Sequence, residues 1–110
     1  MKYVLPLVMF AAPAFADAPT VEQVTYNSGR FSVTLSHGDT GWDDYADGWR
    51  VELADGTVIG TRVLAHPHVD EQPFTRSSSI AVPAGVSEVF IRASTNTGGW
   101  ATDAVRYQLR

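Results

Sequence analysis

The chain of 110 residues contains no cysteine, and its single lysine and both methionines lie within the first ten residues. Without cysteine the protein forms no disulfide and offers no thiolate to a metal or a substrate. The scarcity of methionine also removes the soft ligands that select copper(I). The core must therefore be held by packing alone, and a metal site would have to use imidazole or carboxylate ligands.

Positive charge is scarce as well. Eight Lys and Arg residues stand against twelve Asp and Glu residues, which gives a formal net charge of −4. An acidic surface repels phosphate groups, so we expect neither nucleic acid nor an anionic membrane face as a partner.

Long hydrophobic runs are missing except at the start of the chain. Lys2 is followed by an apolar stretch over residues 3–15, and Ala14-Phe15-Ala16 has the small-x-small pattern of a signal peptidase site. The stretch is shorter than the roughly 20 residues that span a bilayer. We therefore predict that residues 1–16 are a removed export signal and that Asp17 begins a product without membrane insertion, periplasmic or secreted. No cysteine follows the signal to carry a lipid anchor.

Helical spacing is also absent beyond the signal, where apolar and polar residues alternate with a period of two. In "RFSVTLSH" the alternation places Phe31, Val33 and Leu35 on one face of a strand. "GWRVELADGTVIGTRVL", residues 48–64, is typical of a hairpin, because Asp55-Gly56 favours the positive φ angles of a tight turn. Further strands are expected over 20–26, 74–82, 86–94 and 100–109.

About seven short strands without helices predict an all-β fold, an antiparallel sandwich forming a single domain over residues 17–110. Across residues 20–109 the pattern resembles small exported bacterial immunoglobulin-like and fibronectin type III-like domains. The resemblance depends on Trp49 early in the third strand, the "VPAG" corner at residues 82–85 and the closing hairpin. The chain departs from those families in lacking a cysteine pair, and Val89 stands near the place of their corner tyrosine. Trp49 is expected in the core, in register with Val51.

Two stretches are longer than strand connections require, and such loops often carry function. In "AHPHVDEQP", residues 65–73, His66 and His68 flank Pro67, which favours extended backbone and would place both rings on one side. Imidazole nitrogens suit zinc or copper(II), with His37 and Glu71 as further ligands. The alternative is a polar turn without a metal.

The other stretch is "GDTGWDDYADG", residues 38–48. Its carboxylates could bind calcium, but the Asp-x-Asp-x-Asp-Gly order of the hand-like calcium loop is absent, so zinc or copper(II) is preferred. Aromatic rings beside carboxylates also mark surfaces that bind proteins or glycans. The candidate partner-binding residues are Trp42, Asp43, Asp44, Tyr45, Phe74 and Trp100.

Catalysis finds little support, since "SSS" at residues 77–79 lacks a nucleophile-elbow pattern and no spacing pairs an acid with a base. We expect a non-enzymatic exported binding module, with loops 38–48 and 65–73 as its recognition surface for a protein or glycan of the cell envelope. The alternative is a periplasmic protein that binds zinc or copper(II) through His66, His68, His37 and a carboxylate.

Overall fold

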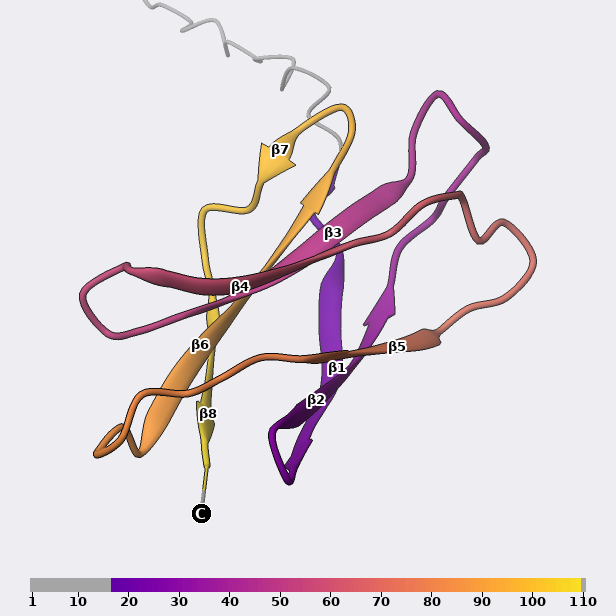
Figure 1. The fold of residues 1–110 in the computed structure, drawn as a ribbon. Coiled ribbons are helices and arrows are strands. Elements are labelled where there is room, and N and C mark those ends of the chain that lie inside the picture. Colours follow the sequence, from indigo (N-terminus) through magenta and orange to yellow (C-terminus); the bar gives the residue numbers. More distant parts are fainter. Residues whose placement is uncertain (1–16, 110) are drawn as a thin grey trace, which may run out of the picture.

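The computed structural model describes residues 17–109, and the predicted export signal at residues 1–16 lies outside them. Within the described range the chain forms two antiparallel sheets, which confirms the predicted all-β sandwich class (Figure 1). The strands are β1 (Thr20–Asn27), β2 (Arg30–Ser36), β3 (Ala46–Glu52), β4 (Val58–Val63), β5 (Phe74–Ser79), β6 (Glu88–Thr95), β7 (Gly99–Trp100) and β8 (Val105–Gln108). There are eight strands because the expected closing strand is divided into β7 and β8. No helix in this range is long and apolar enough to cross a membrane.

The smaller sheet has the order β1-β2-β5 and shows the period-two alternation directly. Phe31, Val33 and Leu35 of β2 are buried, whereas the hydroxyls between them lie on the other face. Those hydroxyls pair across the strands: the oxygen atoms of Ser32 and Ser77 lie 2.6 Å apart, as do those of Thr34 and Thr75. Cross-strand pairs of this kind fix the register on the polar face.

The larger sheet has the order β4-β3-β6, and both β7 and β8 pair with β6. The β3–β4 hairpin turns at the predicted position, with the backbone N–H of Leu53 donating to the carbonyl of Thr57 at 2.8 Å. Only Gly56 takes a positive φ there, at 90°, so the expectation for Asp55 was wrong. Its carboxylate instead accepts the backbone N–H of Thr57 at 2.9 Å, which closes the turn by a side-chain hydrogen bond.

One hydrophobic core lies between the two sheets. Trp49 is fully buried, as its register with Val51 predicts, and Ile91 of the neighbouring strand is fully buried too. The core also takes in Phe31 and Leu35 from the smaller sheet. Because both sheets contribute to the same cluster, the two layers stabilise each other.

The β2–β3 and β4–β5 loops leave the sandwich on the same side, at the right of Figure 1. The β2–β3 loop covers residues 37–45, because residues 46–48 of the predicted loop belong to β3. The β4–β5 loop covers residues 64–73, and the β6–β7 turn covers residues 96–98. Hydrogen bonds join these three segments, and we call them together the loop end.

Candidate functional site

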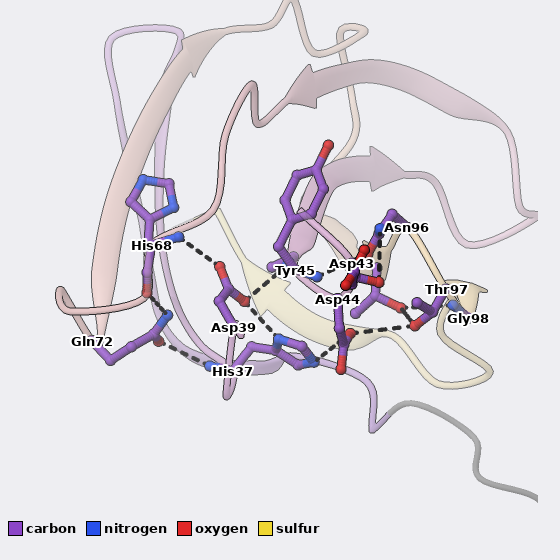
Figure 2. A network of polar contacts seen from close by, with 12 residues as sticks. His37, Asp39, Asp43, Asp44, Tyr45, His68, Gln72, Asn96, Thr97 and Gly98 are labelled. Atoms are coloured by element: carbon purple, nitrogen blue, oxygen red, sulfur yellow. Dashed lines mark hydrogen bonds and ion pairs between the residues drawn. The ribbon is translucent and has the colours of Figure 1, made fainter. Parts of the chain in front are cut away.

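The centre of the loop end is the buried carboxylate of Asp39, whose side chain is fully inaccessible to solvent. One oxygen accepts the Nδ1–H of His37 at 2.6 Å and the backbone N–H of Ala46 at 3.0 Å. The other accepts the backbone N–H of His68 at 2.8 Å (Figure 2). A single side chain of the β2–β3 loop thus anchors the β4–β5 loop, 29 residues away in the sequence.

Gln72 joins the same two loops a second time. Its side-chain oxygen accepts the backbone N–H of His37 at 2.9 Å, and its amide nitrogen donates to the carbonyl of His68 at 2.9 Å. Both functions of the amide are therefore satisfied by loop backbone (Figure 2). With Asp39, this bridge holds the two loops in one arrangement.

His68 is a buried histidine, with 5% of its surface exposed. Its ring stacks on Phe74 with the centroids 3.8 Å apart, and Nε2 accepts the Nη2–H of Arg76 at 2.8 Å. Since Arg76 can only donate, Nε2 is unprotonated and the proton of the neutral ring is on Nδ1. Desolvation, with the nearby charges of Arg76 and His66, lowers the pKa of His68 below its ordinary value.

The four predicted metal ligands are not brought into one coordination geometry. The ring centroids of His66 and His68 lie 4.6 Å apart, but Nε2 of His68 already accepts a hydrogen bond from Arg76. Nδ1 of His37 is bonded to Asp39, and Glu71 forms a largely exposed ion pair with Arg76 at 3.7 Å. In residues 17–109 no group of three or more His, Asp or Glu side chains is arranged to hold a metal ion.

Trp42 sits at the outermost turn of the loop end. The backbone N–H of Asp44 donates to the carbonyl of Gly41 at 3.2 Å, so Trp42 and Asp43 occupy the middle of a tight turn. Trp42 is 66% exposed and packs edge-on against Tyr45 with the ring centroids 5.5 Å apart. An exposed indole fixed by a neighbouring ring is a suitable anchor for a partner.

The turn is supported by Asn96, a residue that sequence reasoning missed. Its side-chain oxygen accepts the backbone N–H of Tyr45 at 2.8 Å, and its amide nitrogen donates to the carbonyl of Trp42 at 3.0 Å (Figure 2). The signal available in the sequence was an asparagine in the turn-forming "TNTGG" stretch. Nothing local, however, indicates which distant loop its amide contacts.

Two of the predicted partner-binding residues lie elsewhere. Phe74 is only 2% exposed and forms the stacking partner of His68, so its proposed contact with a partner is corrected to a core role. Trp100 is 38% exposed but lies on the outer face of the larger sheet, over the guanidinium of Arg50. The loop end therefore presents Trp42, Tyr45, Asp43 and Asp44 without these two rings.

Comparison with known proteins finds a relative in Halomicrobium mukohataei. A protein of Halomicrobium mukohataei described as "Putative lipoprotein" is 42% identical over 86 residues, which cover 78% of this chain and 42% of that protein. The chain thus spans less than half the length of this relative. No family model matches the chain. No solved structure matches it either.

Proposed function

We propose that this chain is a small exported, non-enzymatic binding module whose recognition surface is formed by the predicted loops 38–48 and 65–73. The observation that supports it most is the buried Asp39 carboxylate, which fixes both loops while Trp42 remains 66% exposed. A surface ordered before binding loses less conformational entropy on contact with its partner. Loops that only connect strands do not need this internal bonding.

The position of these loops in the sandwich also supports a recognition role. In immunoglobulin variable domains the B–C and F–G loops meet at one end and form part of the antigen-binding surface. Here the β2–β3 loop and the β6–β7 turn meet in the same way, through Asn96 and Tyr45. We propose on this basis that the sandwich is immunoglobulin-like or fibronectin type III-like. It differs from the constant-type immunoglobulin domain in that β4 pairs with β3 and not with β5.

The chemistry of the surface points to a protein or glycan partner in the cell envelope. Trp42 and Val69, which is 50% exposed, offer apolar contact area, and the exposed carboxylates of Asp43, Asp70 and Glu71 are close to them in the sequence. The predicted leader supports export, and so does the description of the Halomicrobium protein as a lipoprotein. Whether the product stays in the periplasm or is secreted does not affect this surface.

A non-enzymatic role is supported by the geometry around the buried His37–Asp39 pair. In hydrolases of the triad type, the second imidazole nitrogen faces a nucleophilic hydroxyl or thiol. Here Nε2 of His37 lies 3.9 Å from a carboxylate oxygen of Asp44, which is a poor nucleophile for acyl transfer. The pair serves instead to position the loop.

The test is retention of envelope material on the immobilised protein. We expect wild-type protein to retain a defined protein or glycan from solubilised envelopes, and Trp42→Ala with Val69→Ser to abolish that retention. Val105→Ser is the matched control, because Val105 is 43% exposed on β8, outside the loops. Protease or periodate treatment of the envelopes then separates a protein partner from a glycan. Equal retention by the loop variant and the wild-type protein would refute the proposal.

The metal alternative depends on one observation, the 4.6 Å separation of the His66 and His68 rings. Zinc and copper(II) titrations at about pH 7.5 and about pH 5.5, on either side of the histidine pKa, test it. Micromolar binding that disappears at the lower pH and in His66→Ala would establish a site. Because Arg76 occupies Nε2 of His68, we expect weak binding that is indifferent to His66→Ala.

A further inference from the structure

The outer face of the larger sheet contains a groove that is separate from the loop end. It has a volume of about 270 Å³ and runs across β3 and β6, from β4 to β7. Its lining includes Asp47, Gly48, Thr61, Val63, Ser94 and Trp100.

Gly48 forms the floor of this groove because it has no side chain. A Cβ at this position would lie 3.2 Å from Oγ of Ser94 and 3.6 Å from Cη2 of Trp100. Any other residue would therefore fill the space between the two walls. One wall is Val63, which is 70% exposed, and the other is the Trp100 indole, which is 38% exposed.

Charged side chains beneath the Trp100 indole fix its position. The guanidinium of Arg50 lies 4.2 Å from the ring centroid, and Glu52 fixes that guanidinium through a 2.7 Å hydrogen bond from Nε. Arg92 donates to both oxygens of the same carboxylate through Nε and Nη2, and its Nη1 donates to the carbonyl of Ala101, next to the indole in the sequence. The ring is thus fixed in position, and Trp100 is one of the residues that line the groove.

Polar groups stand at the same site. The hydroxyl of Ser94 donates to Oδ1 of Asp47 at 2.5 Å, which orients a carboxylate that lines the groove. A carboxylate has about four acceptor positions, so Asp47 can accept further hydroxyl groups. Thr61 is exposed on the β4 side and can both donate and accept.

We propose that this groove binds a neutral saccharide ring. The C–H face of a pyranose packs against an indole, and its hydroxyl groups require acceptors such as the Asp47 carboxylate. An anionic ligand would be repelled by Asp47, and a purely apolar ligand would leave the Asp47 and Thr61 polar groups desolvated and unpaired. A neighbouring hollow of about 320 Å³ shares Gly99 and Trp100 with the groove, so there is room for a second sugar unit.

The groove is independent of the loop end: Asp47 and Gly48 fall within the predicted stretch 38–48, but they belong to β3 and not to the loop that presents Trp42. The experiment is a titration of the ¹⁵N-labelled chain with neutral methyl glycosides of glucose, galactose, mannose and N-acetylglucosamine, and with their disaccharides. We expect saturable shifts of the backbone amides of Gly48, Val63 and Ser94 with at least one of these probes. A disaccharide that also shifts Ala101 would show that the second hollow is occupied.

Matched variants make the result specific. Val63→Ser removes one wall and should weaken binding by about tenfold, whereas Val58→Ser, at an exposed valine of the same strand outside the groove, should leave it unchanged. Trp100→Ala should abolish the shifts, and Trp42→Ala at the loop end should not. Absence of saturable shifts with every neutral probe, or equal effects of Val63→Ser and Val58→Ser, would overturn the proposal. Val63 is largely exposed, so Val63→Ser should fold, and its effect reports on binding at the groove.

Discussion

At the scale of single residues, the structure separates side chains that support the fold from those that remain free to bind. Trp49 and Trp42 illustrate this, because one indole is fully buried and the other is 66% exposed. Replacement by alanine should therefore reduce stability at Trp49, whereas at Trp42 it should reduce the binding of a partner.

We expect Trp49→Ala to lower the free energy of unfolding by on the order of 3 to 5 kcal/mol, because it leaves a large cavity between the sheets. Urea unfolding followed by circular dichroism measures the change. Trp42→Ala is the control and should alter stability by no more than about 0.5 kcal/mol. A Trp49→Ala protein that unfolds like the wild type would contradict the observed packing.

Asp39→Ala should be destabilising although it removes only a small side chain. It leaves the backbone N–H groups of Ala46 and His68 without their acceptor, and each unpaired buried donor costs about 1 to 3 kcal/mol. We expect faster hydrogen exchange at those two amides and a lower free energy of unfolding. Asp43→Ala, at an exposed carboxylate of the same loop, is the control. Unchanged exchange at His68 would argue against the loop anchor.

His68 makes the stability depend on pH in a defined direction. Burial and Arg76 lower its pKa in the folded protein, whereas the unfolded chain keeps a value of about 6.5. The folded state therefore favours the neutral ring. Its contribution is fully present above about pH 6.5 and is lost as the pH falls below that value, because the unfolded chain binds the proton more readily.

We expect an NMR titration of the histidine rings to give a midpoint below about 6.5 for His68. The free energy of unfolding should fall less between about pH 7 and pH 5 in His68→Gln than in the wild type. A His68 midpoint above that of a free histidine would show that the ring is not held neutral by its surroundings.

At the scale of strands, β3 connects the core to the outer sheet face. Trp49 and Val51 point inward, while Arg50 and Glu52 between and beyond them point outward. Glu52 is only 3% exposed, because Arg50 and Arg92 close over it. The hydrogen bond from Arg92, together with that from Arg50, lowers the pKa of Glu52 below its ordinary value.

We expect Glu52→Gln to reduce the stability at neutral pH by about 2 kcal/mol, since hydrogen bonds to charged groups are lost and both arginines remain partly solvated. The effect should shrink as the pH falls through the acid range. Ionised Glu52 stabilises the wild type fully only above the carboxyl pKa of the unfolded chain, and this contribution is lost as the pH falls through the lowered pKa of Glu52 in the folded protein. Unfolding curves recorded across this pH range measure the difference in stability between the two proteins. Hydrogen exchange at the backbone amide of Ala101, whose carbonyl accepts a hydrogen bond from Arg92, should become faster in the same variant. Glu88→Gln, at a more exposed ion pair with Arg106, should have little effect.

At the scale of the whole molecule, the two sheets share one core and should unfold together. We expect residues 17–110 to give a strand-dominated far-ultraviolet spectrum and a single cooperative thermal transition, as small single domains do. Calorimetric and van't Hoff enthalpies should then agree. Two resolved transitions, or a helical double minimum, would contradict the predicted single domain.

The sequence by itself determined the positions of the strands up to β6 and the inward position of Trp49, but not the division of the closing strand into β7 and β8. Side chains of a strand alternate between two faces, so the period of the apolar residues fixes both the element and its buried side. The hairpin turn at residues 55–56 follows from equally local rules. These features depend on neighbours in the chain, and the sequence contains them completely.

Only the tertiary structure determines which side chains of the loops remain exposed and able to contact a ligand. His68 and Phe74 are chemically fit for a ligand site, yet their stacking buries both. The role of Asp39 depends on a backbone N–H 29 residues away, and that of Trp100 on the missing Cβ of Gly48 in β3, two strands away in the sheet. Such contacts arise from how loops and strands approach one another in space, where hydrogen bonds and close packing discriminate over fractions of an ångström.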